Sequence, residues 1–183
     1  MQSLLSQLLI TEHDVILDAG DFISLNGDLW KTNPEEYEQN VKQLLNFFSV
    51  YADEYHHQKE EEILFPAISK KSETVAAGIV EELLEHHENF RLLIRQIKTT
   101  LVNKDFSKTQ QLFEKYINLL KDHIAVENDE LFPMADDIFN YDELDKLYHK
   151  CIDKDREIGT SRKEEFGSRI KNITINEADR SDT

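Results

Sequence analysis

The sequence has little of what interrupts or cross-links a polypeptide chain. Its 183 residues include 5 glycines, 3 prolines and a single cysteine, Cys151. One cysteine excludes an intramolecular disulfide framework and fits a reducing compartment, so we expect a cytoplasmic protein. Because glycine and proline are the main breaks in regular structure, their scarcity favours long, uninterrupted elements.

Positive charge and long apolar runs are also scarce. The 21 Lys and Arg residues stand against 37 Asp and Glu, which gives a formal net charge of -16. Such an excess repels phosphate backbones and anionic membrane surfaces, so we expect neither a nucleic-acid partner nor a membrane partner. No run approaches the roughly 20 apolar residues of a membrane span. The apolar N-terminal stretch lacks a basic start and a small-residue cleavage site, and we expect it to begin a helix rather than to act as a signal peptide.

Apolar residues recur at three- and four-residue spacings, which predicts an all-α protein. Long helices are expected over residues 3–29, from Pro34 to near Pro66, over 72–102, and from after 103–105 to near Pro133, because proline interrupts a helix. The Asn33-Pro34 pair is typical of a helix start. Four long helices with short connections predict an up-down-up-down four-helix bundle over residues 1–137.

A weaker apolar pattern follows the predicted bundle. It begins at Tyr141 and is interrupted near Gly159, which predicts a helical extension over residues 138–172 that packs on the outside of the bundle. We expect no chemistry from this region. Residues 173–183 are polar enough to form a frayed tail.

One stretch of the sequence occurs twice. Residues 56–66 are HHQKEEEILFP and residues 123–133 are HIAVENDELFP, so both fit a template of His, three residues, Glu, three residues and Leu-Phe-Pro. Residues four apart share one face of a helix, with their Cβ atoms about 5–6 Å apart. Each copy therefore directs an imidazole and a carboxylate to one place, and two such pairs facing each other can hold two metal ions.

The first copy can be aligned in two ways, because His57 and Glu61 have the same spacing as His56 and Glu60. At about 100° per residue, His56 lies within the apolar stripe of its helix, whereas His57 points about 100° further round, towards solvent. Only His56 and Glu60 reproduce the distance to Leu-Phe-Pro found in the second copy. This comparison favours His56 with Glu60 and leaves Glu61 on a solvated face.

The same count places His123 and Glu127 on the apolar stripe of the fourth helix. A histidine on such a face is often a hydrogen-bonded core residue, but two buried carboxylates cost several kcal/mol unless they are paired or bound to a metal. The nearest cation on the second helix, Lys59, is expected to extend outward to solvent. The stripe therefore favours a metal site over an ion pair.

The other two helices offer few further ligands. The first helix provides His13, and the third provides His86 or His87, of which His87 lies nearer the mean apolar direction. His149 is followed four residues later by an aspartate, but it lies on the outer segment and is expected to be an ordinary polar residue. The aromatic residues near the stripes are expected in the core, or else along the route of a small ligand; they are Tyr55, Phe90 and Tyr116.

Taken together, these residues resemble the hemerythrin-like (HHE cation-binding) family. The similarity covers roughly residues 1–137, with EHDVIL, HHQKEEEILFP, HHENFRLL and HIAVENDELFP as anchors in the expected order. It implies a four-helix bundle around a non-haem di-iron centre, an oxo- or hydroxo-bridged pair of iron ions. In this reading Glu60 and Glu127 bridge the irons, and the histidines are terminal ligands: His13, His56, His87 and His123. The family pattern also favours His87, because it places an arginine four residues on, as Arg91 does here.

The resemblance includes one departure from oxygen-carrying hemerythrins, which have five histidines, two of them from the third helix. Here Leu83 and Arg91 occupy the positions four residues either side of His87, which leaves four, and the second bridging carboxylate is Glu rather than Asp. Four histidines and two glutamates are similar to the ligand set of di-iron proteins associated with iron-sulfur cluster repair and nitric oxide stress.

Counting ligands suggests a function. Two bridging carboxylates, two histidines per iron and a bridging oxygen make five bonds to each metal, and an octahedral preference then leaves about one open position on each. We expect the centre to bind a small diatomic ligand or peroxide in a redox or stress response or in iron-centre repair. The alternatives are an oxygen carrier or sensor without turnover, and iron storage or delivery. Manganese or zinc can occupy such a site in vitro, and whether the protein is an enzyme stays open.

Overall fold

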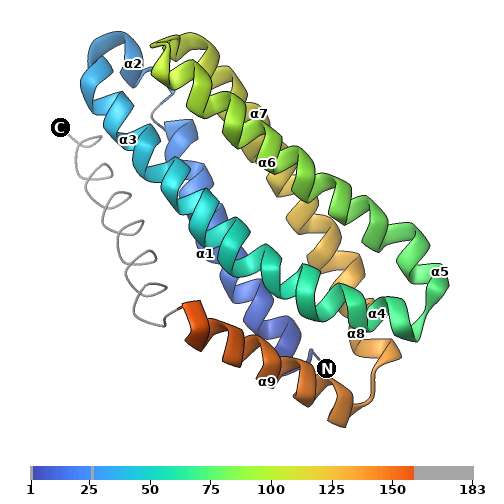
Figure 1. Ribbon diagram of the computed structural model, residues 1–183. Coiled ribbons are helices and arrows are strands. Elements are labelled where there is room, and N and C mark those ends of the chain that lie inside the picture. Colours follow the sequence, from blue (N-terminus) through green and yellow to red (C-terminus); the bar gives the residue numbers. More distant parts are fainter. Residues whose placement is uncertain (1, 26, 159–183) are drawn as a thin grey trace.

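A computed structural model describes residues 2–25 and 27–158, which form a bundle of long helices (Figure 1). The first is α1 (Leu4–Leu25), and α2 (Leu29–Thr32) is a single turn that follows it. The second is a continuous run of α3 (Pro34–Phe47), the π-helical segments η1 (Phe48–His57) and η2 (Glu60–Leu64), and α4 (Phe65–Lys71). The described ranges contain no strand, so the all-α prediction is confirmed.

The third and fourth long helices are built in the same segmented way. The third joins α5 (Glu73–Val75), the π-helical η3 (Ala76–Val80) and α6 (Glu81–Val102). The fourth joins α7 (Phe106–Val126), the π-helical η4 (Glu127–Leu131) and α8 (Phe132–Ile138). A fifth helix, α9 (Tyr141–Ile158), lies across the end of the bundle near the N-terminus (Figure 1).

Side-chain caps define where several of these helices begin. Asn33 accepts a hydrogen bond from the backbone N–H of Glu36 at 3.3 Å, and Pro34 occupies the first turn, as its fixed φ and missing N–H allow. Asp105 caps α7 by accepting from the N–H of Lys108 at 3.1 Å. The predicted start of the second helix is confirmed, whereas the first helix ends at Leu25, four residues before the predicted end.

The predicted helix ends at Pro66 and Pro133 are wrong. Both helices continue past the proline, to Lys71 and to Ile138. In each case the proline stands in the first turn of an α-helix that follows a π-helical segment. A residue in that position needs no intrahelical N–H bond of its own, so the proline costs little there.

The core is divided into two apolar clusters. One is rich in aromatic residues and includes Phe48, Phe90 and Phe113; the other lies nearer α9 and includes Leu9 and Phe132. Along each of the four long helices, buried polar residues stand between the positions that enter one cluster and those that enter the other. The bundle therefore encloses a polar layer between two apolar ones, and this layer positions the site.

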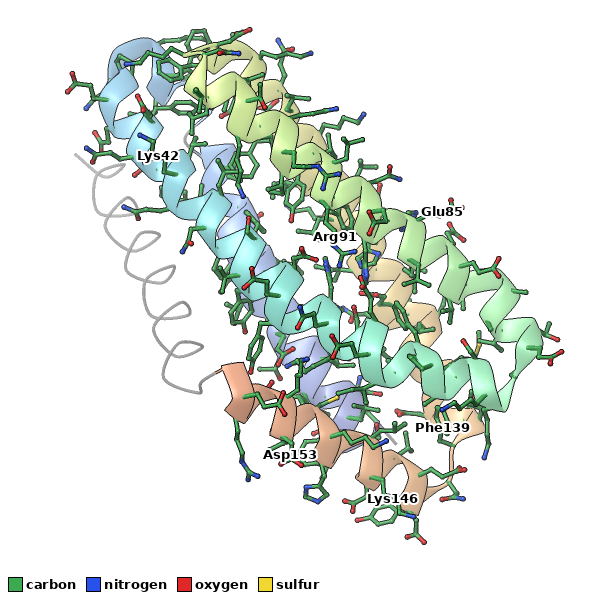
Figure 2. The ribbon with its side chains drawn as sticks, in the orientation of Figure 1. Lys42, Glu85, Arg91, Phe139, Lys146 and Asp153 are labelled. Carbon is green, nitrogen blue, oxygen red and sulfur yellow. The ribbon has the colours of Figure 1, made fainter. Side chains whose placement is uncertain are left out.

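Helix α9 packs against α1 and η2. Its Leu147 and Cys151 are buried in the second apolar cluster, as is Phe139 in the connection that precedes the helix (Figure 2). The rest of the predicted extension and the predicted tail, residues 159–183, lie outside the described residues. Among the helices that the structure does describe, none combines the length and the apolar character needed to cross a membrane.

Candidate metal centre

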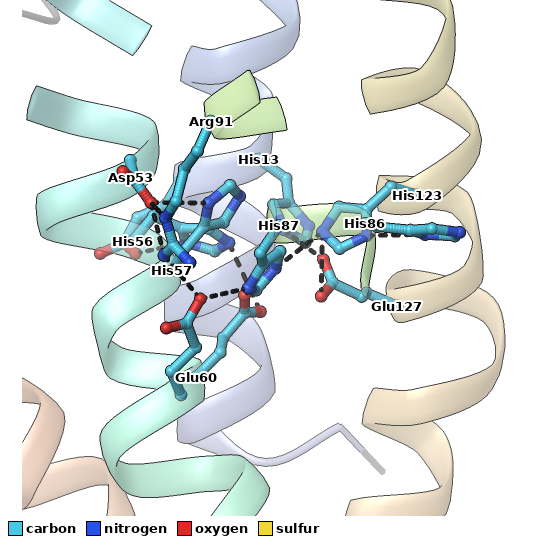
Figure 3. Close-up of polar contacts among 12 residues, drawn as sticks. His13, Asp53, His56, His57, Glu60, His86, His87, Arg91, His123 and Glu127 are labelled. Atoms are coloured by element: carbon cyan, nitrogen blue, oxygen red, sulfur yellow. Dashed lines mark hydrogen bonds and ion pairs between the residues drawn. The ribbon is translucent and has the colours of Figure 1, made fainter. Parts of the chain in front are cut away.

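The six residues singled out in the sequence meet in the polar layer of the bundle (Figure 3). They come from all four long helices, and each is at most 1% exposed. Helix α1 supplies His13 and α6 supplies His87. The second long helix supplies one histidine and one glutamate, and the fourth supplies another such pair: His56 and Glu60, and His123 and Glu127.

Glu60 faces histidines on two different helices. Its Oε1 lies 3.5 Å from Nε2 of His56, four residues earlier on the same helix. Its Oε2 lies 3.6 Å from Nε2 of His87 on α6. The two oxygens of one carboxylate thus point to separate histidines, as a bridging ligand between two metal positions would.

Glu127 repeats this arrangement on the opposite side of the bundle. Its Oε2 lies 3.1 Å from Nε2 of His13, and its Oε1 lies 3.2 Å from Nε2 of His123. Both glutamates therefore belong to two four-residue groups whose ligand atoms lie within 4.8 Å of one another. One group contains the His13 and His56 pair and the other the His87 and His123 pair, and both groups share both carboxylates.

Within the described residues, the contacts that the two glutamates make with these histidines are not hydrogen bonds. Among the described residues, both carboxylate oxygens of Glu60 and of Glu127 are buried without a hydrogen-bond partner, as are Nε2 of His13 and Nε2 of His56. Leaving so many buried polar atoms unpaired costs free energy at each of them. A bound cation would satisfy all of these atoms, so the donor set fits a metal centre.

Hydrogen bonds on the far side of three rings fix which nitrogen faces the cluster. Nδ1 of His56 lies 2.9 Å from Glu12, and Nδ1 of His87 lies 2.7 Å from Glu61. Nδ1 of His13 lies 2.8 Å from the side-chain oxygen of Asn128. A carboxylate can only accept, so a neutral ring donates from Nδ1 and keeps its Nε2 lone pair directed inward, the arrangement typical of metal-binding histidines.

Burial and mutual charge perturb the cluster strongly. Burial lowers the pKa of His13 to about 4 and lowers the pKa of His123 well below its usual value. Burial, together with the charge of Glu60, raises the pKa of Glu127 well above its usual value. Burial opposes protonation of His56, but the Glu60 and Glu12 carboxylates raise the pKa of His56 to about 9. Without a metal the cluster therefore retains protons that a cation would displace.

His57 is buried, contrary to the prediction that it points to solvent. It is 2% exposed, its ring stacks on His87 with centroids 3.9 Å apart, and its Nδ1 has no hydrogen bond within the described structure. The prediction assumed α-helical geometry, whereas His57 ends the π-helical η1. A π turn holds roughly one residue more than an α turn, so neighbouring side chains are separated by a smaller angle and both histidines reach the interior. His57 forms a third ligand group with His87 and His123.

Glu61 is partly buried, contrary to the expectation that it lies on a solvated face. Its side chain is 24% exposed and binds both the ring of His87 and the guanidinium of Arg91, each at 2.7 Å. Burial alone would raise the pKa of Glu61, but these two hydrogen bonds lower it. Arg91 also binds Asp53, and it lies beside the second long helix (Figure 2). The orientation of His87 is thus held by an ion-pair network that spacing alone did not reveal.

Two further buried charges were missed or misplaced by sequence reasoning. Lys59 does not extend outward; it is 0% exposed and contacts Glu12, which is itself fully buried. Glu12 stands next to His13 in the sequence, and its position on the buried face was the available signal. By contrast, His86 is about one-third exposed on its side chain, and His149 is exposed, in line with the sequence analysis.

A cavity of about 250 Å³ opens beside the cluster. His57 forms part of its wall, together with the aromatic rings of Phe48, Phe90 and Tyr116. The charged residues along it include Arg91, Arg95, Lys98, Asp53 and Glu54. The cavity connects the histidine layer with the exposed side chains between the second long helix and α6.

A four-helix bundle whose interior holds clustered histidine and carboxylate ligands defines a class of metal-binding helical proteins. The chain matches the Hemerythrin HHE cation binding domain over residues 4–135, and it belongs to that family. Comparison with curated proteins and with solved structures returns no significant match. The family match includes all six clustered ligand candidates and excludes α9.

Proposed function

We propose that the protein binds two iron ions and that this di-iron centre takes a small diatomic ligand, dioxygen or nitric oxide, or peroxide. The observation that carries the proposal is the sharing of both carboxylates, Glu60 and Glu127, between two histidine pairs. In this assignment each glutamate would hold both metal ions, and each histidine would hold one of them. Membership of a cation-binding family supports a metal, and the imidazole and carboxylate donors suit iron.

When bound, the iron pair would supply open coordination positions for the small ligand and would exchange electrons with it. The residues of the protein orient the metal ligands and exclude bulk water. Glu12, Glu61 and Asn128 hold three imidazole rings so that their Nε2 atoms face inward. The apolar clusters on either side keep the layer out of bulk water, which strengthens every electrostatic interaction inside it.

The cavity beside His57 is the route that we assign to the small ligand. It is large enough for several water-sized molecules, and it ends at a histidine that belongs to the third ligand group. Phe90 and Tyr116 form part of the cavity wall, which supports the second of the two roles expected from the sequence, that of lining the route of a small ligand. Their burial limits the path to small molecules.

Redox or stress response, or the repair of iron centres, is the role that we favour. Reversible binding by a carrier or sensor, without turnover, is the second candidate. His57 favours that candidate, because a third imidazole within reach of the His87 and His123 position can fill one of the places otherwise open there. A centre with fewer open coordination positions can bind a small ligand but has no position left for a second reactant. Iron storage or delivery is a further alternative, which the sequence analysis left open.

Aerobic purification with metal analysis and an absorption spectrum tests the metal centre. We expect two irons per chain and the charge-transfer bands of a bridged ferric pair. A chain that remains colourless and metal-free after anaerobic loading with ferrous iron would refute the proposal. The same experiment with manganese and zinc measures the preference for iron.

Adding dioxygen or nitric oxide to the reduced, iron-loaded protein separates the two candidate roles. A spectrum that appears and disappears through several cycles of ligand addition and removal supports a carrier or sensor. Consumption of peroxide or nitric oxide in excess of the protein supports turnover. The His57→Ala variant should move the protein towards turnover if His57 fills a metal position.

A further inference from the structure

A second buried ionic cluster adjoins the candidate metal centre through His56. While Nε2 of His56 faces Glu60, its Nδ1 lies 2.9 Å from Oε2 of Glu12. The other oxygen of Glu12 contacts the ammonium group of Lys59. That ammonium group also binds Oδ1 of Asp155 at 2.7 Å and lies 3.9 Å from the centre of the Tyr55 ring.

This chain of contacts is shielded from water along its whole length. His56 is 1% exposed, Glu12 and Lys59 are 0% exposed, and Asp155 is 5% exposed. It contains two carboxylates and one ammonium group. Because buried charges are stable only when they are balanced, the surplus negative charge favours a cation at its other end, which is His56.

Asp155 comes from α9, which lies outside the part of the chain that matches the family. The other contacts of α9 include apolar residues and Cys151, and at the surface two ion pairs: Lys154 with Glu62 at 2.6 Å and Glu143 with Lys71 at 2.7 Å. Asp155 thus connects α9 to the buried charges beside the candidate metal ligand. The contact joins residues that are 96 positions apart in the sequence.

We infer that Lys59 and Asp155 are positioning residues for the metal centre: they hold Glu12 against His56 and so link metal occupancy to the docking of α9. The inference rests on the proposed metal centre. A coupling of this kind is reciprocal, so the factor by which a metal tightens the docking of α9 is the factor by which docked α9 tightens metal binding.

Charge sets the direction of the coupling. A divalent cation on Nε2 of His56 carries more charge than the proton that it displaces. It therefore strengthens the hydrogen bond that Nδ1 donates to Glu12 and draws the charge of that carboxylate towards the ring. Lys59 is then less fully neutralised by Glu12 and binds Asp155 more strongly. Metal binding therefore tightens the docking of α9, and loss of the metal loosens it.

Cys151 provides the measurement, because it is the only cysteine in the chain and is 0% exposed on the packed face of α9. Its reaction with a thiol-specific disulfide reagent reports how often α9 opens. The full chain is compared with and without Co²⁺, whose visible spectrum reports ligand geometry. We expect Cys151 of the wild type to react more slowly when Co²⁺ is bound.

The Asp155→Asn variant should bind Co²⁺ about tenfold more weakly, within the range typical of lost outer-shell partners. Its Co²⁺ spectrum should differ from that of the wild type, and Cys151 should react faster. Asp153→Asn is the matched control: it makes the same change two residues away, but the Asp153 side chain is 68% exposed and binds Arg156 at the surface (Figure 2). This control should behave as the wild type in all three measurements.

A double variant, Lys59→Met with Asp155→Leu, separates coupling from general stabilisation by the metal. It removes both charges, so neither is stranded in the core. We expect it to fold and to bind Co²⁺, while the reactivity of Cys151 no longer depends on the metal. A metal-dependent rate in this double variant, or wild-type behaviour of Asp155→Asn, would overturn the inference and leave the metal centre standing. Failure of the wild type to bind Co²⁺ or iron would overturn both.

Discussion

The pKa values of the two bridging candidates shift in opposite directions before a metal is bound, that of Glu60 downward and that of Glu127 upward, and this difference predicts an unusual variant. Burial and the charge of Glu60 raise the pKa of Glu127 well above its usual value, so Glu127 keeps its proton to a higher pH than an ordinary glutamate does. A neutral carboxylic acid is close to an amide in size and polarity. At a pH at which Glu127 is protonated, we therefore expect Glu127→Gln to change the free energy of unfolding of the metal-free protein by no more than about 1 kcal/mol.

The same substitution should remove most of the stabilisation that a metal confers, because Glu127 belongs to both four-residue ligand groups. A ligand at 100 times its dissociation constant stabilises the folded state by about 2.7 kcal/mol per site, or about 5 kcal/mol for two sites. With an unfolding entropy of about 2.1 cal/mol/K per residue, a chain of this length gains about 14 °C in Tm. We expect the wild type to show this gain and Glu127→Gln to show little of it.

The assay is thermal unfolding followed by circular dichroism, with and without anaerobic ferrous iron. Glu130→Gln is the control, because Glu130 lies on the same π-helical segment and is exposed. A full metal-dependent gain in Glu127→Gln would refute the assignment of Glu127 as a shared ligand. A loss of several kcal/mol in its metal-free form would refute the claim that Glu127 is protonated there.

Three further predictions concern pH, the third long helix and the aromatic core. Because a metal displaces protons from Glu127 and from His56, whose pKa is about 9, affinity should rise with pH and level off above about 9, as metal titrations across pH would show. His87→Ala should lose metal, whereas His86→Ala should retain it in metal analysis, because His86 is about one-third exposed. Phe113→Ala should destabilise the metal-free protein by about 3–5 kcal/mol in denaturant unfolding, since the ring is 0% exposed among other aromatic rings.

The sequence predicted most of the bundle because the signals for helices lie within a few residues of the positions that they determine. Apolar spacing marks helices, and side chains such as Asn33 mark where they begin. The repeated His-to-Glu spacing selected His56, Glu60, His123 and Glu127, because residues four apart share a helix face. The apolar faces of the other two helices and the family pattern added His13 and His87, and all six meet in the structure. Those parts of the fold and of the candidate site depend on the chain within one or two turns.

What the sequence did not predict depends on helical geometry and on contacts between distant helices. The π-helical η1 brings His57 inward, and no residue within it marks the wider turn. Lys59 was expected in water because nothing near it in the sequence indicates Glu12, 47 positions away, or Asp155 on α9. A buried charge can be recognised only once its partners are known, and here the partners come from other helices.

The positions of the buried charges indicate how the candidate site is organised. The residues that can hold a metal all come from the part of the chain that matches the family, whereas the charge behind His56 is balanced by Asp155 from outside it. A bundle that only bound a metal would need no buried ion pair to a fifth helix, because an apolar contact packs as well without the cost of removing charges from water. A buried polar contact instead makes the packing of α9 depend on the charges around it. For this reason the contact between Lys59 and Asp155 is where we expect metal occupancy to affect the packing of a helix outside the family match.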